Sequence, residues 1–170
     1  MNDSSLSHTL LPGNDCFGCG PMNPHGLNIT VRLDPENANR IVAEFNPQNH
    51  MTGFPGITHG GVIYTALDCM ATWSGMVLRK TKAIWILRSA SMKYHRPAFQ
   101  GRPLALSAVI ASQSDDAWQA IEVHTEARDT ENNLLAEGNF KVIPLPPDKF
   151  MALTSIAEMP QSWANWLHRH

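Results

Sequence analysis

The chain has 170 residues, which is long enough for one domain with a substantial hydrophobic core. Its formal net charge is −2 and its pI is about 6.4, so no global positive field favours nucleic acid or an anionic membrane as a partner. Charged residues make up 16% of the chain, against an average of about 25%, and this low fraction favours an oligomer over a monomer.

The first residues carry no basic start followed by an apolar run, so no secretory signal is expected. The three cysteines are too few to suggest a disulfide framework. We therefore expect a reducing, cytoplasmic location.

Residues 1–26 are predicted to be an irregular lead-in, because proline and glycine interrupt them repeatedly. Cys16 and Cys19 form a C-x-x-C pair that resembles half of a metal knuckle, but a structural zinc site needs four ligands. Cys69 falls inside a predicted helix, and His8 and His25 are the nearby extra ligand types. We expect the cysteines to be packing residues, with no metal and no cofactor; zinc binding or redox chemistry is the alternative.

Residues 27–34 alternate between apolar and polar side chains, which predicts a half-buried strand with its odd-numbered apolar residues covered. A turn and a returning strand over 40–45 follow. Residues 46–58 then form a loop that leads directly into the next element. Asn49 and His50 in this loop are candidate substrate-binding residues, although a plain surface loop explains them equally well.

Residues 58–78 predict a central helix that begins with His-Gly-Gly at positions 59–61. Apolar residues recur at spacings of three and four, and the opposite face is also uncharged, which is typical of a helix buried on more than one side. Asp68 is the only Asp, Glu, Lys or Arg in this stretch. A buried carboxylate is costly without a partner or a task, so Asp68 is a candidate catalytic residue. A structural or surface role is the alternative, and a membrane span is disfavoured by the interrupting polar residues.

The start of this helix is a second candidate site. Its first N–H groups lack internal partners and lie at the positive end of the helix dipole, so Gly60 and Gly61 can polarise a carbonyl oxygen. His59 can cap the turn or orient a ligand. Asp68 lies eight residues after Gly60, or roughly 12 Å along the axis at about 1.5 Å per residue. If both groups act on one substrate atom, they must come from two copies of the helix.

Strands are predicted over 83–96, 104–112 and 118–128, and a last strand begins at residue 134 and is ended by the prolines from 144 onward. In the first of these, Trp85 and Leu87 are expected on the face opposite Ala90, Met92 and Tyr94. The tail, residues 144–170, is predicted to contain a short helix over 161–168. Two strands, one apolar helix and four strands predict an α+β domain over residues 27–143, with an antiparallel sheet curled around the helix.

The sequence resembles hotdog-fold acyl-CoA thioesterases, of the 4-hydroxybenzoyl and phenylacetate-pathway type, over roughly residues 16–143. Four passages carry the resemblance: 16–27 (CFGCGPMNPHGL), 55–61 (PGITHGG) followed by Asp68, 92–97 (MKYHRP) and 136–140 (AEGNF).

The resemblance implies a six-stranded sheet wrapped around a central helix. It also implies a homodimer, often doubled to a homotetramer, with the active site at the subunit interface. Gly60, with Gly61 behind it, would polarise the thioester carbonyl through its backbone N–H. Asp68 from the partner would be the nucleophile or the general base, and His59 would hold the turn. The substrate is then an acyl-CoA, hydrolysed to a carboxylic acid and CoA, with no nucleic-acid or membrane partner.

Leu87 stands where many relatives have a threonine. Arg88, Ser89 and Ser91 are the nearby polar candidates for substrate binding, and Ser89 is the candidate replacement for the threonine. Two other functions stay open: a non-catalytic acyl-CoA binding or sensor protein, and an acyl-thioester hydratase or dehydratase. The basic residues available for the CoA phosphates are Arg79, Lys80, Lys82, Arg88, Lys93 and Arg96.

Overall fold

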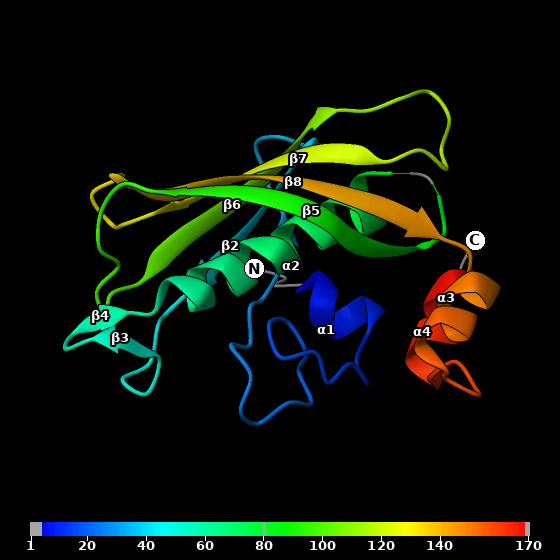
Figure 1. Ribbon diagram of the computed structural model, residues 1–170, viewed down its shortest axis with the longest axis horizontal. Coiled ribbons are helices and arrows are strands. Elements are labelled where there is room, and N and C mark those ends of the chain that lie inside the picture. The colour runs from blue at the N-terminus through cyan, green and yellow to red at the C-terminus, as the bar shows by residue number, and fades with distance from the viewer. Residues whose placement is uncertain (1–4, 80, 169–170) are drawn as a thin grey trace.

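The computed structural model describes residues 5–79 and 81–168 (Figure 1). Its elements, in chain order, are α1 (Leu6–Leu10), β1 (Arg32–Leu33), β2 (Arg40–Phe45), β3 (Thr52–Phe54), β4 (Ile57–Thr58), α2 (Gly60–Leu78), β5 (Ile84–Tyr94), β6 (Leu104–Ser112), β7 (Ile121–Arg128), β8 (Leu134–Leu145), α3 (Pro147–Thr154) and α4 (Gln161–His168). Six strands form one antiparallel sheet in the order β1-β2-β6-β7-β8-β5, and this sheet curves over α2. The predicted α+β fold, a curved six-stranded sheet around one central helix, is confirmed.

Helix α2 is buried on two sides. Ala66, Leu67 and Met70 are fully buried in the core, where the helix packs against the strands of the sheet. On the opposite side Cys69 and Met76 are also buried, because the N-terminal lead-in covers that side of the helix. Among the described residues, α2 is the one helix long and apolar enough to cross a membrane, and its two covered sides account for that composition.

Strand β5 contains a β-bulge that changes which residues face the helix. Its register with β8 shifts between Leu87 and Ser89, so Arg88 is the extra residue. Trp85, before the bulge, faces Gly75 of α2, and Tyr94, after the bulge, hydrogen-bonds to Gly60 of the same helix. The prediction that these two aromatic residues lie on opposite faces is therefore wrong, because an inserted residue reverses the alternation of a strand.

The segment before β2 is less regular than predicted. Only Arg32 and Leu33 pair with β2 as strand β1. Residues 27–31 form no strand, and Asn28 has a left-handed φ of 53°. Their backbone bonds to the lead-in instead: Leu27 N–H donates to Phe17 O at 2.7 Å, and Ile29 N–H to Gly18 O at 3.0 Å. The predicted alternation still holds for residues 27–31, whose odd-numbered side chains are buried. The lead-in thus replaces a strand as the partner of this segment.

The tail forms two helices, of which the sequence predicted only α4. Trp166 of α4 is fully buried, as its predicted apolar stripe requires. Strand β8 also runs through Pro144, past the predicted end. Pro144 pairs with Trp85 of β5, whereas the ladder with β7 ends at Val142. Its missing N–H therefore removes no bond on the β7 side, and proline is tolerated there.

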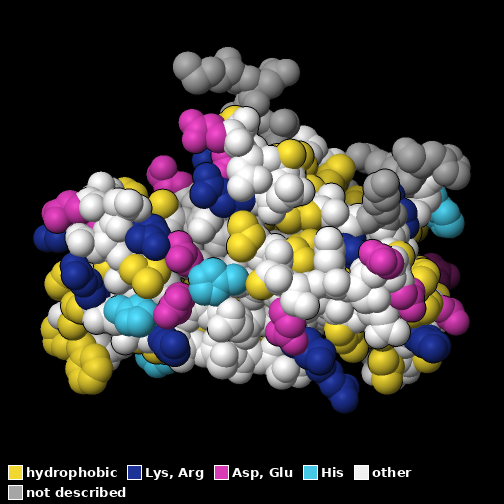
Figure 2. Space-filling view, turned by 90° about the horizontal axis from the view of Figure 1, so that it is seen from above, with side chains coloured by type: hydrophobic (Ala, Val, Ile, Leu, Met, Phe, Trp, Pro, Cys, Tyr) yellow, Lys and Arg dark blue, Asp and Glu magenta, His cyan; other side chains and the backbone are white. Residues whose placement is uncertain are grey.

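The outer face of the sheet carries interspersed acidic, basic and histidine side chains (Figure 2). Glu137 lies among three of them: its carboxylate is 3.1 Å from His95 Nε2, 3.8 Å from His124 Nε2 and 4.0 Å from Lys93 Nζ. This mixture gives no large patch of one sign, in agreement with the absence of a positive field in the composition.

We expect Gly75→Ala to destabilise the fold. A Cβ at Gly75 would lie 2.4 Å from Cδ2 of the buried Trp85 ring. Overpacking of this kind costs about 1–3 kcal/mol, which exceeds the gain of up to about 1 kcal/mol in helix propensity. Urea unfolding should report a net loss of about 1–2 kcal/mol. In the Trp85→Leu background, where the ring is absent, the same substitution should cost less; an equal loss in both backgrounds would contradict this contact as the cause.

Candidate active site

The backbone at the start of α2 leaves one amide group free. His59 is the N-cap, and its Nδ1 accepts a hydrogen bond from Gly61 N–H at 2.9 Å. The Val62 N–H donates to His59 O at 2.9 Å. Within residues 5–79 and 81–168, the Gly60 N–H has no hydrogen-bond acceptor. The amides of Gly60 and Gly61 were both predicted as hydrogen-bond donors to a carbonyl oxygen. Of the two, the Gly60 amide is the one available to a ligand.

Contacts from three directions hold this helix start in place. Tyr94, at the end of β5, donates its hydroxyl to Gly60 O at 3.0 Å. Thr58 N–H donates to Ala98 O, and His59 N–H donates to Met51 O, both at 2.8 Å. The free amide is therefore preorganised, as a group that stabilises a developing negative charge must be.

The Gly60 amide lies at a cavity of about 630 Å³, which we call the helix-start cavity. Apolar side chains from several elements line it, and Arg96 lies at its wall. Phe54 and Tyr94 both line the cavity and are strongly exposed, at 72% and 52% of their surface. Its volume is in the range of small-molecule sites, about 300–1,000 Å³.

Asp68 lies in a separate cavity of about 290 Å³, which we call the Asp68 cavity. One carboxylate oxygen, Oδ1, is buried and has no hydrogen-bond partner among the described residues. Burial raises the pKa of Asp68 to about 6, and the negative charge of Cys16 contributes in the same direction. An unpartnered carboxylate oxygen can accept a proton as a general base or attack a carbonyl carbon as a nucleophile.

The Asp68 cavity is lined by segments far apart in the sequence. Leu87 of β5 lines it, together with Phe150 of α3 and Trp163 of α4. This role of the tail was not predicted, because no helix was expected over α3 and the stripe of α4 indicates only that one face is buried.

Gly60 and Asp68 belong to different cavities of one rigid helix. Their spacing of eight residues corresponds to about 12 Å along the axis. A single chain therefore does not bring the free amide and the free carboxylate to one substrate atom.

Two comparisons with known proteins, one with family sequence models and one with solved structures, found matches. Residues 55–131 match the sequence model of the thioesterase superfamily. No curated protein matches the chain. Among solved structures, a thioesterase from Haemophilus influenzae has a TM-score of 0.63 and 17% identity, covering 75% of this chain and 86% of its own. The PaaI protein of the phenylacetic acid degradation operon of E. coli has a TM-score of 0.61 and 16% identity, covering 71% and 81%.

A protein of Streptococcus mutans, solved with bound acetyl CoA, has a TM-score of 0.57 and 13% identity, covering 63% of this chain and 82% of its own. The chain has the hotdog fold of the thioesterase superfamily. The expected family resemblance is thereby confirmed at the level of the fold.

The candidate residues of β5 lie outside both cavities of this hotdog domain. Arg88, Ser89 and Ser91 are exposed on the strand, and neither cavity includes them. Leu87 lines the Asp68 cavity, whereas Ser89 lies beyond the bulge. Within one chain, Leu87 is therefore the residue of this pair that lines the Asp68 cavity. Ser89, the predicted replacement for the family threonine, does not line it.

The candidate residues of the 46–58 loop are likewise exposed and separate from Gly60. The backbone oxygen of Asn49 accepts hydrogen bonds from Thr52 Oγ1 at 2.8 Å and from Gln100 Nε2 at 2.9 Å. His50 lines a third cavity, of about 710 Å³, which it shares with the lead-in. The contact of Tyr94 with Gly60 was not predicted, although Tyr94 lies in the 92–97 passage that carries the family resemblance.

Proposed function

We propose that the hotdog domain is an acyl-CoA thioesterase whose active site is shared between two copies of the chain. One observation carries the proposal: a free amide at the tip of α2 and an unpartnered carboxylate near its middle lie in separate cavities. The thioesterase-superfamily match supports the reaction class. Two structural neighbours, from Streptococcus mutans and Streptococcus pneumoniae, were solved with acetyl CoA and coenzyme A, which supports the substrate class.

In the proposed reaction, the thioester carbonyl oxygen accepts a hydrogen bond from Gly60 N–H. Asp68 of the second copy either attacks the carbonyl carbon or removes a proton from an attacking water. The negative charge that develops on the oxygen is stabilised by the Gly60 amide and the positive end of α2. The C–S bond then breaks and the CoA thiolate leaves; water supplies the hydroxyl of the carboxylic acid and the proton of the thiol.

We propose that the two copies pair through β5. This strand has 11 residues and is hydrogen-bonded to β8 on one side, while its other side forms an edge of the sheet. The opposite edge strand, β1, has only 2 residues. A long unpaired edge is a template for another strand, and Arg88 and Lys93 are its only charged residues. The resulting homodimer, alone or doubled to a homotetramer, would bring the cavities of two chains together.

Arg96 is the proposed contact for a CoA phosphate. It is the one member of the six basic candidates that lines the helix-start cavity. Lys80 lies outside the described residues, so its position plays no part in this choice. CoA would then enter with its phosphates near Arg96 and its thioester near Gly60.

Assays of CoA release test the proposed activity. The purified protein is incubated with aryl, short, medium and long acyl-CoAs, and free CoA is measured by chromatography because the chain has three thiols of its own. We expect CoA and carboxylic acid in equal amounts from at least one substrate. Products that differ from their acyl-CoA by one water molecule would indicate the hydratase or dehydratase alternative.

A non-catalytic acyl-CoA sensor is the second candidate function. It is favoured by Leu87, which lines the Asp68 cavity where a hydroxyl side chain would have offered the carboxylate a partner. Tight binding of acyl-CoA by calorimetry, together with no release of CoA from any substrate, would establish this function in place of hydrolysis.

A further inference from the structure

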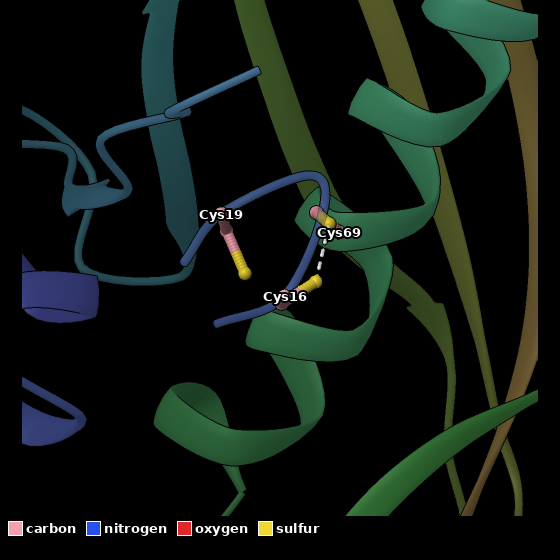
Figure 3. A group of neighbouring side chains, drawn as sticks. All are labelled: Cys16, Cys19 and Cys69. Atoms are coloured by element: carbon pink, nitrogen blue, oxygen red, sulfur yellow. Dashed lines mark hydrogen bonds between the residues drawn. The ribbon is translucent and has the colours of Figure 1, made fainter. Parts of the chain in front are cut away.

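All three cysteines of the chain lie together (Figure 3), and they line the same cavity as Asp68. Cys16 and Cys19 come from the lead-in and Cys69 from α2, so residues 53 positions apart meet in space. Their three sulfur atoms lie within 4.8 Å of one another, and none of them forms a disulfide. Each offers one ligand atom to a common point.

The spacing of the sulfurs fits a single metal ion. A zinc–thiolate bond is about 2.3 Å long, so tetrahedral coordination places two sulfurs roughly 3.8 Å apart. Cys16 Sγ and Cys69 Sγ are 4.0 Å apart. An iron–sulfur cluster would place several metal and sulfide ions between its cysteines, and sulfurs this close leave room for one ion.

Hydrogen-bond donors are directed at the sulfurs. The indole N–H of Trp73 donates to Cys19 Sγ at 3.2 Å, and the Asn14 side-chain amide donates to the same sulfur at 3.8 Å. Donors of this kind favour thiolates over thiols and are typical of the surroundings of metal ligands.

No positive side chain balances this group. The cavity that the three cysteines share with Asp68 is lined, within the described part of the chain, by no Lys, Arg or His. Thiolates that bind a metal ion here would therefore find no counter-charge among these side chains, and a buried charge without a partner is costly. A bound cation would supply the missing charge.

The loop between Cys16 and Cys19 is fitted closely to α2. A Cβ at Gly18 would lie 2.2 Å from Cys69 Sγ. A Cβ at Gly20 would lie 2.3 Å from Cys16 N, where the Gly20 N–H donates to Cys16 O at 2.9 Å. Only glycine permits both approaches, so the turn is shaped to present its two sulfurs to the third.

We propose that Cys16, Cys19 and Cys69 bind one zinc ion as thiolates. Binding releases the thiol protons to solvent and forms three Zn–S bonds. No other Cys, His, Asp or Glu of residues 5–79 and 81–168 joins this group, so the fourth position is open to the Asp68 cavity and is filled by water or another external ligand. The ion fastens the lead-in to α2 beside the candidate catalytic carboxylate.

Metal analysis of untagged protein, purified from zinc-supplemented cells, tests this site. We expect about one zinc per chain, and a decrease of about tenfold or more in Cys16→Ser and in Cys69→Ser. His25→Ala removes a potential ligand of the lead-in that lies outside the cluster, and this variant should keep its zinc. Zinc-free wild-type protein, or an intact mass lower by the two hydrogens of a disulfide, would overturn the proposal.

Cobalt substitution of the wild-type protein keeps the test valid if the serine variants do not fold. Co²⁺ exchanged into the site should give intense visible bands of tetrahedral geometry and a near-ultraviolet thiolate-to-cobalt charge-transfer band. A spectrum of octahedral, oxygen-bound Co²⁺ would overturn the proposal. Neither measurement depends on thioester hydrolysis. The zinc site can therefore be refuted while the proposed activity stands, and the activity can be refuted while the zinc site stands.

Removal of the metal should lower the thermal stability of the wild type. Since the ion binds the folded chain and joins the lead-in to α2, a zinc chelator should shift the unfolding midpoint downward. Calorimetry of Cys69→Ser should show no such shift. An identical chelator effect on the two proteins would mean that the stabilising ion is bound elsewhere.

Discussion

Asp68→Asn should lower kcat for thioester hydrolysis by about 100- to 10,000-fold, the usual contribution of a general base. Asparagine keeps the shape of the side chain but cannot remove a proton or attack a carbonyl carbon. The folded state should not lose stability. The Oδ1 atom of Asp68 is buried without a hydrogen-bond partner, and the substitution replaces this charged group with a neutral one. Steady-state kinetics and calorimetry measure the two effects separately.

Asp115→Asn is the matched control for this substitution. Asp115 is an exposed carboxylate in the turn before β7, and it lines neither cavity. This variant should retain both its activity and its unfolding temperature. Equal hydrolysis rates for wild type and Asp68→Asn would remove Asp68 from the reaction, whereas loss of folding in Asp68→Asn would assign it a structural role.

Gly60→Pro should lower the rate by about 100- to 1,000-fold, because proline removes the one N–H proposed to stabilise the oxyanion. The position suits proline: Gly60 is the first helical residue, where proline is favoured, and His59 has ψ of 133°, which a residue before proline adopts. Gly60→Ala keeps the N–H and places its Cβ 3.4 Å from Tyr94, an ordinary contact. Kinetics of the two variants distinguish the lost donor from the added side chain, and equal losses would contradict the donor role.

Mixing the two inactive proteins tests whether the site is shared. In a mixed dimer of Gly60→Pro and Asp68→Asn, one site combines the intact Gly60 of one chain with the intact Asp68 of the other. Random exchange of equal amounts gives about half mixed dimers, each with one of two sites intact, so about a quarter of the wild-type activity should return. If both groups acted within one chain, no intact site would form and the mixture would stay inactive.

Local patterns were sufficient for most of the fold. The apolar period of α2, the alternation in β2 and the composition of β6 are local features of the sequence. The predicted ranges for the two strands equal those observed, 40–45 and 104–112. The predicted helix differs by the two residues before Gly60. The uncharged opposite face of α2 also indicated correctly that something besides the sheet covers this helix.

The sequence by itself also determined that Gly60 and Asp68 lie too far apart on one helix to meet, since the rise of a helix is fixed. Tertiary structure decided the rest. The bulge at Arg88 depends on the register between β5 and β8, and the choice between the two glycine amides depends on where the His59 ring points. The group of three thiols needs the lead-in to fold onto α2. The bulge and the group of thiols depend on contacts between residues distant in the chain, which no local pattern records.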